Sequence, residues 1–310
     1  MKRWLIPAAF LALLPPLALE ALSEKCLQLI VQATKLTEDQ IRTTELEHGF
    51  SNAIQEYETI WKREPFELDS RDTLLKGEII LNPADTGTVR KIAVICHGHT
   101  ANRYAAVKYA DLFYRRGFSV LIYDERYFGK SGGQFCTLGQ EESKDLSEIL
   151  TFVRRRFGAE CRIAVHGESM GAATAILSLQ YQKPDLVIAD CPFADSELLF
   201  SQWIQKNLHL PASLILRIVE AKAKRRFQYD IRSTCPVEAL LSSDVPVCLI
   251  HGKEDSLIPC SHSEMLYEAC RSPRSELHLI DSADHAQSIV VDSEGYKVIL
   301  DEFLEKCGLA

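Results

Sequence analysis

Residues 165–171 of this chain read Val165-His166-Gly167-Glu168-Ser169-Met170-Gly171. The mostly apolar residues 161–165 predict a short buried strand before the serine, and residues 172–177 predict a helix after it. A chain that passes from strand to helix within so few residues strains its central residue and pushes that side chain outward, and flanking glycines avoid Cβ clashes. The free N–H groups and the positive end of the helix then face the Ser169 oxygen. We interpret Ser169 as a nucleophile; the alternative is an inert serine in a glycine-rich turn.

The composition is that of a globular protein with a large core. The chain has 310 residues, of which 46% are apolar, and a net charge of −8. This length is enough for one large domain or two small ones. The charge pattern contains no broad basic field, which argues against nucleic acid as a partner.

The ten cysteines do not have the spacing of a disulfide framework. Cys96, Cys161, Cys191 and Cys248 lie in or beside apolar runs, where a free thiol packs as a small hydrophobic group. No C-x-x-C pair occurs, so the sequence predicts no zinc or redox motif, and we expect no metal or cofactor. Cysteine usage of this kind favours thiols that are buried or kept reduced.

Residues 1–23 have the pattern of a secretory signal peptide or a signal anchor. Two positive charges precede the apolar run 4–19, and the small residues Ala21 and Ser23 offer a cleavage site of the small-x-small kind. The run is shorter than the ~20 residues of a membrane span, so an apolar helix packed on the domain is the alternative. We expect membrane association through this segment and a membrane-anchored or secreted protein, although the free cysteines leave a cytoplasmic location open.

The region 24–64 is expected to be a helical extension that joins the N-terminal segment to the main domain or packs on it. Its apolar residues recur at steps of four, four, three and four and so share one helix face: Leu46, Phe50, Ile54, Tyr57 and Trp61. Thr37 and Gln40 have the spacing of a capping box. No chemical motif occurs in this region.

Strands and helices alternate over residues 65–310, which predicts an α/β domain. Residues 66–69 and 76–81 are expected to form a hairpin. The other expected strands are 91–97, 118–124, 161–165, 186–191, 245–251 and 276–280, and the expected helices are 104–116, 138–157, the segment from the serine to about residue 182, 261–271 and 293–307. This alternation is typical of a mostly parallel sheet with helices on both faces.

The alternation breaks at residues 193–241, which contain no expected strand. Two helical segments, 196–208 and 212–227, are separated by Pro211. Ligands of open α/β sheets bind at the carboxyl ends of the strands, so we expect this insertion to cover that edge as a lid. Its many apolar side chains, such as Leu199, Trp203 and Leu216, should in part face the cleft. We interpret the basic residues at 222–226 as a solvated helix face.

A serine hydroxyl is a poor nucleophile at neutral pH and needs a general base, usually a histidine oriented by a carboxylate. His285 follows the last expected strand, in a loop at the carboxyl edge of the sheet. Asp255 lies in the loop after the preceding strand, and we prefer it to the adjacent Glu254. Asp281 and Asp284 are too close in sequence to His285 to face its ring easily. Asp255 and His285 therefore complete the predicted catalytic set.

The oxyanion that forms during nucleophilic attack needs N–H donors. The backbone of Met170, the residue after the nucleophile, should supply one donor. The other is expected from the backbone of His99, because Gly98 allows the loop after strand 91–97 to turn sharply and aim the next N–H inward. His97 is expected to stabilise this loop through side-chain hydrogen bonds.

These motifs, in this order, resemble the α/β-hydrolase superfamily: His97-Gly98-His99-Thr100, Asp124-Glu-Arg126-x-x-Gly129-x-Ser131, Gly167-x-Ser169-x-Gly171, His251-Gly-x-x-Asp255-x-x-Ile-Pro259 and the loop that ends in His285. Within it, they are similar to the serine aminopeptidase or monoacylglycerol-lipase-like branch, especially its bacterial membrane-anchored members. The resemblance covers about residues 65–307 and implies the α/β-hydrolase fold with a helical lid. It departs at His99, where relatives carry various residues; this side chain could line the acyl pocket.

Three functions follow from these observations. The favoured one is a serine hydrolase that cleaves a small-molecule carboxylic ester through an acyl-enzyme. A serine aminopeptidase would need an acidic lid group to hold the substrate's amine; Asp195, Glu197 and Glu220 are available, but their spacing selects none of them. A catalytically inactive hydrolase fold that serves as a binding module usually lacks one of the catalytic residues, and here all three are present.

Overall fold

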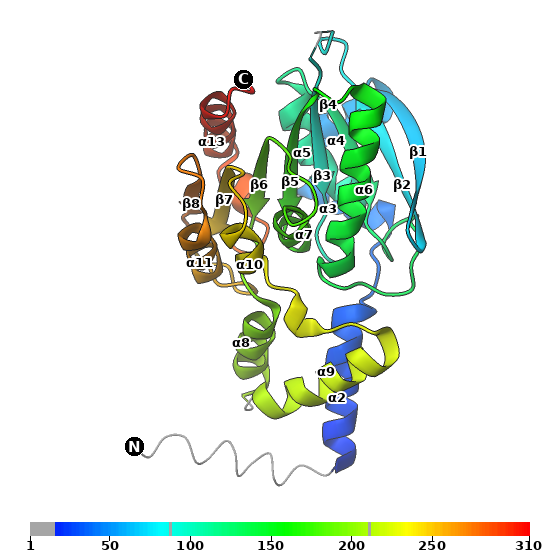
Figure 1. Cartoon of the computed structure of the whole chain (residues 1–310), viewed down its shortest axis with the longest axis vertical. Helices are drawn as coiled ribbons and strands as arrows, with labels where there is room; N and C mark the ends of the chain where they lie inside the picture. The colour runs from blue at the N-terminus through cyan, green and yellow to red at the C-terminus, as the bar shows by residue number, and fades with distance from the viewer. Residues whose placement is uncertain (1–15, 87–88, 210–211) are drawn as a thin grey trace.

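The computed structural model describes residues 16–86, 89–209 and 212–310. Its centre is an eight-stranded sheet in the order β1-β2-β4-β3-β5-β6-β7-β8 (Figure 1). The strands are β1 (Lys62–Ser70), β2 (Thr73–Leu81), β3 (Lys91–Cys96), β4 (Ser119–Asp124), β5 (Arg162–Glu168), β6 (Leu186–Asp190), β7 (Val247–Gly252) and β8 (Glu276–Ile280). β2 pairs antiparallel with β1 and β4, and the remaining pairs are parallel. The predicted mostly parallel sheet is confirmed.

Helices cover both faces of the sheet, and each face has its own apolar core. One face carries α4 (Ser51–Thr59), the short helix η1 (Arg103–Ala106), α5 (Val107–Tyr114), α12 (Ser288–Val291) and α13 (Ser293–Lys306). The other carries α6 (Gln140–Phe157), α7 (Met170–Ser178) and α11 (Ser261–Ala269). Side chains of β3 alternate between the cores: Ala93 and Ile95 belong to the first, Ile92 and Val94 to the second.

The helix face expected at residues 46–61 is divided between two helices. α3 (Glu38–Glu47) begins with the predicted capping box and ends before Gly49, where a φ of 90° interrupts the helix. α4 follows, and β1 already begins at Lys62, inside the region 24–64 that was expected to be helical. Leu46 of α3 and both Ile54 and Tyr57 of α4 nevertheless pack on the same core. The spacing of apolar residues therefore indicates which side chains are buried together, but it does not show that they belong to one continuous helix.

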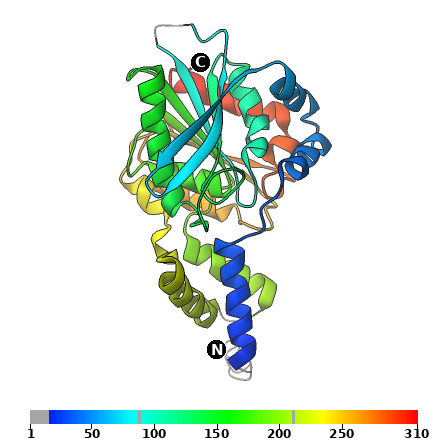
Figure 2. The same ribbon diagram turned by 90° about the vertical axis from the view of Figure 1, so that its right-hand side faces the viewer.

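The boundary expected at residue 23 falls inside a helix. α2 (Pro16–Val31) runs across it and projects from the carboxyl end of the sheet (Figure 2). Its residues Cys26, Leu27 and Ile30 are buried in a third core, shared with the insertion. Residues 1–15, which hold most of the predicted signal segment, lie outside the described residues. Among the described helices, none is both long and apolar enough to cross a membrane.

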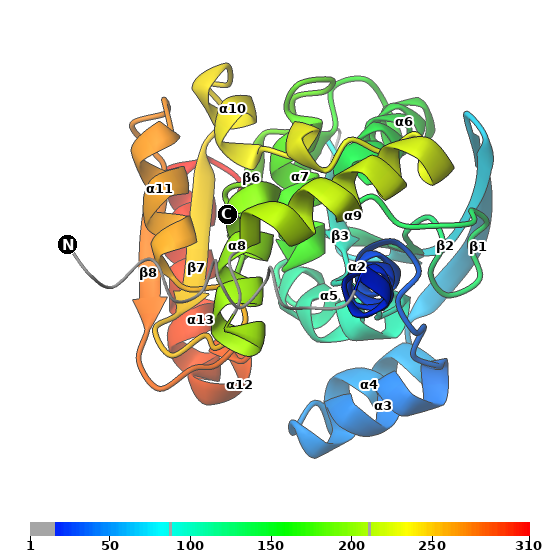
Figure 3. The same ribbon diagram turned by 90° about the horizontal axis from the view of Figure 1, so that it is seen from below.

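The insertion 193–241 lies across the carboxyl ends of the strands (Figure 3). α8 (Ser196–Leu208) and α9 (Ala212–Phe227) form this lid, and the short helix η2 (Ile231–Ser233) follows. α10 (Pro236–Leu241), which the sequence analysis does not predict, returns to the sheet, where Ala239 and Leu240 join the core of α7 and α11. The lid therefore ends before α10.

Of the basic residues 222–226 that were expected to form a solvated helix face, Lys224, Arg225 and Arg226 are exposed, whereas Lys222 of α9 is buried. Its side chain is only 8% exposed, and its Nζ atom lies 2.8 Å from both Ser23 Oγ and Glu20 Oε1 of α2. Arg226 reaches Glu24 of the same helix at 2.6 Å. These contacts bind α9 to α2, and a local charge pattern cannot reveal them because the partners are about 200 residues apart in the chain.

Candidate active site

Ser169 occupies the turn between β5 and α7 with φ 56° and ψ −114°, a strained conformation for a residue with a side chain. The turn is tight, because a Cβ on Gly167 would clash with the backbone of Gly171, and a Cβ on Gly171 would clash with the backbone of Cys96. β5 extends to Glu168, past its expected end at residue 165. Close backbone approach thus requires the glycines, and the strain falls on the serine itself.

Ser169, His285 and Asp255 form one hydrogen-bonded chain. The Ser169 hydroxyl lies 2.8 Å from Nε2 of His285, and Nδ1 of the same ring lies 2.7 Å from Oδ2 of Asp255. Ser169 follows β5, Asp255 follows β7 and His285 follows β8. Because these strands are parallel, their carboxyl ends meet at one edge of the sheet. The fold therefore brings together the three residues that the sequence analysis selects.

Asp255 is fixed by hydrogen bonds to both carboxylate oxygens. Oδ1 accepts from the backbone N–H groups of Leu257 at 2.9 Å and Ile258 at 2.7 Å, and Oδ2 also accepts from Nε2 of His251 at 3.1 Å. Burial raises the pKa of Asp255, but the hydrogen bonds from His251 and His285 outweigh it and hold this pKa well below its usual range. Burial lowers the pKa of His285, but the hydrogen bond and charge of Asp255 outweigh it and raise this pKa above its ordinary value.

His251 is a supporting residue whose role the sequence analysis missed. Its ring is fully buried at the end of β7. Nδ1 accepts from the Ser263 hydroxyl at 2.7 Å, and Nε2–H is shared between Asp255 and the Ile258 carbonyl, the latter at 2.8 Å. The i, i+4 spacing of His251, at the end of the strand, and Asp255, in the loop that follows, was the available signal.

The other carboxylates near His285 have other partners. Glu254 is exposed, and Asp281 pairs with Lys253 at 2.6 Å. Asp284 accepts from two backbone N–H groups, those of Ser256 and His285, at 2.7 Å each. Among the described carboxylates, Asp255 is the one that hydrogen-bonds to the His285 ring.

The backbone N–H groups of His99 and Met170 are free donors beside Ser169. Met170 begins α7, so its N–H group has no partner within the helix. Within the described parts of the chain, neither N–H group donates a hydrogen bond to another backbone group. Gly98 packs against the serine, since a Cβ on it would lie 3.6 Å from the Ser169 Cβ. An oxyanion at Ser169 therefore has two candidate donors.

Two histidine side chains hold the loop that carries the His99 N–H group. Nδ1–H of His97 donates to the Gly98 carbonyl at 2.8 Å, and its Nε2 accepts from the Glu125 N–H at 2.9 Å. Nε2–H of His99 donates to the carbonyl of Ile30 in α2 at 3.2 Å. Burial lowers the pKa of His99 to about 4, so its ring is neutral at pH 7.

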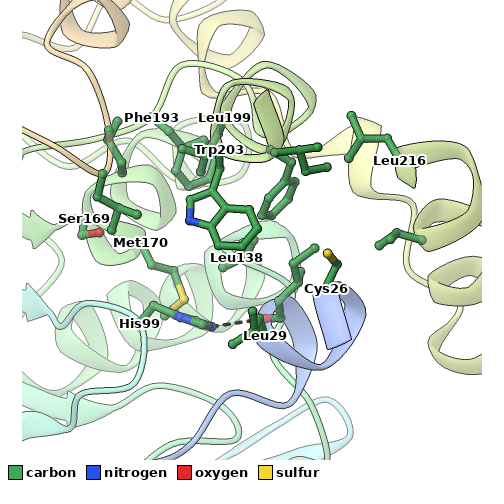
Figure 4. A pocket seen from close by; sticks show the side chains of 16 residues that line it. Cys26, Leu29, His99, Leu138, Ser169, Met170, Phe193, Leu199, Trp203 and Leu216 are labelled. Carbon is green, nitrogen blue, oxygen red and sulfur yellow. Dashed lines mark hydrogen bonds between the residues drawn. The ribbon is translucent and has the colours of Figure 1, made fainter. Parts of the chain in front are cut away.

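An apolar cavity of about 230 Å³ opens in front of Ser169 (Figure 4). Among the described residues that line it, none carries a charge at neutral pH. As expected, part of the lid's apolar side chains face this space: Leu199, Phe200, Trp203, Ile204 and Leu216. α2 supplies a further wall that the sequence analysis does not predict, made of Cys26, Leu29 and Ile30.

Comparison with known proteins identifies the family of this chain. A family model described as serine aminopeptidase, S33, matches residues 87–241. The uncharacterized protein YqkD of Bacillus subtilis is 35% identical over 215 residues, which are 68% of this chain and 70% of that protein. The chain belongs to the serine aminopeptidase S33 family. The uncharacterized protein YfhR of Escherichia coli K12 is 30% identical over 233 residues, 73% of this chain and 74% of that protein.

Solved structures of hydrolases share the fold of this S33-family chain. The esterase Pf2001 of Pyrococcus furiosus superposes with a TM-score of 0.66 at 26% identity, over 81% of this chain and 95% of that one. An acylaminoacyl peptidase superposes with a TM-score of 0.59 at 20% identity, over 79% of this chain and 41% of that one. The chain is therefore a serine-type hydrolase with the α/β-hydrolase fold.

Behind Ser169, this S33-family hydrolase buries a cluster of charged groups, which we call the rear cluster: Glu45, Lys108, Tyr109, Glu168 and Asp190. Nζ of Lys108 lies 3.0 Å from Glu168 and 2.9 Å from Glu45. The Tyr109 hydroxyl donates to Glu168 at 2.7 Å and lies 3.2 Å from Asp190. No sequence pattern reveals this cluster, because α3, α5, β5 and β6 each contribute to it.

Lys108 compensates the negative charges of the rear cluster. Burial raises the pKa of Glu168, but the charge of Lys108 and the hydrogen bond from Tyr109 hold it below its ordinary value. Burial lowers the pKa of Lys108, and the charges of Glu168 and Glu45 more than offset this. Burial, with the nearby Glu168 charge, raises the pKa of Asp190 to about 6. Glu168 is thus an ionised carboxylate directly behind the candidate nucleophile.

Two groups of described residues bring potential metal ligands within 4.8 Å of one another: Cys191, Asp255 and His285, and Cys248, Glu276 and His278. A cysteine binds metal as a thiolate. Burial raises the pKa of both thiols well above its ordinary value. Asp255 and His285 are in addition hydrogen-bonded to each other. These residues fit a hydrogen-bonded site better than a metal centre, and all ten cysteines are free thiols.

Proposed function

We propose that this chain is a carboxylesterase that hydrolyses esters of apolar acyl groups through an acyl-enzyme on Ser169. The observation that carries the proposal is the hydrogen-bonded chain of Ser169, His285 and Asp255 at the edge of an apolar cavity. Membership in a family of serine-type hydrolases supports the chemistry.

In the first step, the Ser169 oxygen attacks the ester carbonyl, and the hydroxyl proton moves to Nε2 of His285. Asp255 keeps the proton of the ring on Nδ1 and stabilises the imidazolium that forms. The backbone N–H groups of His99 and Met170 hold the negative oxygen of the tetrahedral intermediate. The C–O bond to the leaving alcohol then breaks, His285 returns its proton to that oxygen, and the acyl group remains on Ser169.

In the second step, a water molecule takes the place of the alcohol. His285 accepts one proton of the water while the water oxygen attacks the acyl carbonyl. The same two N–H groups stabilise the second oxyanion. The bond from the acyl carbon to the Ser169 oxygen breaks, His285 donates the proton to that oxygen, and the free carboxylic acid leaves.

The cavity favours acyl esters over aminoacyl amides. An aminopeptidase must hold the positive amine of its substrate, and no described acidic side chain lines the cavity. The three acidic candidates in the lid have other partners: Asp195 caps α8, and both Glu197 and Glu220 pair with Arg232, at 3.3 Å and 2.9 Å. Each buried methylene contributes about 0.8 kcal/mol, so four extra acyl carbons could raise kcat/KM by up to roughly two orders of magnitude.

A substrate screen decides between the esterase and the aminopeptidase that the family description suggests. Purified protein is assayed with p-nitrophenyl esters from acetate to octanoate, and with alanine and proline anilides alongside. We expect kcat/KM to rise with acyl length and to exceed that for the anilides. A flat profile, or faster cleavage of the anilides, contradicts the proposed ester specificity.

Ser169→Ala separates an enzyme from an inactive binding module. Loss of one hydroxyl from a half-buried side chain at the cavity leaves no core cavity, so the fold should persist, and activity should fall on the order of 10⁴- to 10⁶-fold. A fluorophosphonate probe should label the wild type and not the variant. Full activity of the variant, or an unlabelled wild type without esterase activity, rejects the assignment of Ser169.

We also propose that residues 1–19 attach the enzyme to a membrane and are retained. The proposal rests on the two positive charges ahead of the apolar run 4–19. Cleavage at 21–23 would remove Glu20, whose carboxylate lies 2.8 Å from Lys222 Nζ. Fractionation of cells that express the full chain tests this proposal. Complete recovery of the protein in the soluble fraction would contradict membrane attachment.

A further inference from the structure

The N-terminal helix α2 closes the end of the cavity that lies away from Ser169. Figure 4 shows Ser169 at one side of the cavity, and Cys26 of α2 with Leu216 of α9 at the other. Cys26 is 6% exposed, whereas Leu29, one turn further along the same face, is 48% exposed. Cys26 is therefore part of the closed wall, and Leu29 lies at the rim.

Specific hydrogen bonds hold α2 and the segment after it against the active-site loops. The Cys136 N–H donates to the Val31 carbonyl at 2.9 Å, and the Leu36 N–H donates to the Thr100 carbonyl at 2.9 Å. The His99 ring donates to Ile30 of α2, and the backbone of His99 is a proposed oxyanion donor. The position of α2 is thus tied to the loop beside Ser169.

Ion pairs hold the outer half of α2 against the lid. Lys222 of α9, which is nearly buried, contacts Glu20 and Ser23, and Arg226 contacts Glu24. α2 is therefore fixed on two sides, by α9 and by the loop that carries His99. A helix held in this way presents a wall of defined position to whatever fills the cavity.

We infer that α2 sets the acyl-chain length that the enzyme accepts, with Cys26 as the residue against which the end of the chain packs. The inference rests on the proposed esterase function. It assigns the selection of substrate to a helix that begins inside the signal pattern 1–23 and whose cavity-lining residues follow that pattern.

The size of the cavity indicates the preferred chain length. An apolar cavity of about 150 Å³ holds benzene, which has six carbons. By the same ratio, this cavity of about 230 Å³ holds roughly nine carbons. Octanoyl groups should therefore fit in front of α2, and dodecanoyl groups should exceed the space.

The test compares one substitution at two positions of the same helix. Cys26→Phe fills the distal end of the cavity, and Gln28→Phe, the control, places the same ring on the exposed side of α2. Loss of contact with about two methylenes predicts an approximately ten-fold decrease in the ratio of kcat/KM for p-nitrophenyl octanoate to that for butanoate in Cys26→Phe. Gln28→Phe should keep the wild-type ratio.

A second variant covers the case in which Cys26→Phe does not fold. Leu29→Ala widens the cavity at a half-exposed position, and its ratio of dodecanoate to octanoate hydrolysis should rise. If Cys26→Phe folds and keeps the wild-type ratio of octanoate to butanoate hydrolysis, the inference is overturned. If that variant does not fold, a wild-type ratio of dodecanoate to octanoate hydrolysis in Leu29→Ala overturns it. A wild type that cleaves no ester and resists the fluorophosphonate probe instead rejects the proposed function.

Discussion

The two sides of Ser169 are built from different chemistry. In front of it lies an apolar cavity whose described lining residues carry no charge, enclosed by α2, α8 and α9. Behind it lies the rear cluster, in which Lys108 compensates two buried carboxylates. An apolar cavity tolerates small changes in its side chains and selects substrates by their size and shape. A buried charge that loses its partner, in contrast, strongly destabilises the fold. Substitutions behind the serine should therefore act on every substrate, and those in front should act according to acyl length.

Among substitutions around Ser169, the largest effect is expected at Asp255, which hydrogen-bonds to His285. Asp255→Asn keeps the shape of the side chain but favours the wrong tautomer of His285, so kcat should fall on the order of 10⁴-fold for short and long esters alike. Glu254→Gln changes an exposed neighbour and serves as the matched control. If Glu254→Gln is the inactive variant, the wrong carboxylate has been assigned.

The next effect concerns stability. Lys108→Met leaves Glu168 and Glu45 buried without their cation, which should lower the free energy of unfolding by about 3–5 kcal/mol. Urea denaturation measures this change in the free energy of unfolding. Lys297→Met breaks an exposed pair with Glu294 and should leave stability nearly unchanged.

A double variant sharpens this result. Adding Glu168→Gln to Lys108→Met removes one of the two uncompensated carboxylates, so it should recover part of the lost stability. If the single variant at Lys108 is as stable as the wild type, the ion pairs of the rear cluster contribute little to folding.

A smaller effect is expected in front of the serine, where α9 offers a matched pair of leucines. Leu216 lines the cavity, and Leu214 on the same helix is 41% exposed. Leu216→Ala removes apolar contact with the acyl chain and should lower kcat/KM for octanoate by about three- to ten-fold relative to acetate. Leu214→Ala should leave the ratio of kcat/KM for octanoate to that for acetate at its wild-type value. Equal losses for both esters in Leu216→Ala would mean that the cavity does not bind the acyl chain.

The smallest effect is a shift of the pH profile. His285 must be neutral to accept a proton, so kcat/KM falls as the pH drops through its pKa, which Asp255 and, to a lesser extent, Glu168 raise. Glu168→Gln removes one of these negative charges, so the acid limb should move to lower pH. Glu254→Gln is again the control. An acid limb that stays in place or moves to higher pH would show that the rear cluster does not act on His285.

Much of the site can be predicted from the sequence because its information is local. The glycines around Ser169 and the short strand and helix beside them identify the turn within seven residues. Asp255 and His285 follow from their places after successive strands, because parallel strands bring their carboxyl ends to one edge. The alternation of strands and helices likewise determines the fold class.

Only the tertiary structure decides what surrounds these residues. Charge pattern assigns Lys222 to the solvent, and its burial depends on α2, nearly 200 residues earlier. Lys108 and Glu45 carry no motif, and they meet because α3 packs beside the short helix that leads into α5. The sequence by itself singled out Ser169, His285 and Asp255, which the fold joins in one hydrogen-bonded chain. The cavity wall and the rear cluster were decided by packing, because contacts between distant segments leave no periodic signal in the chain.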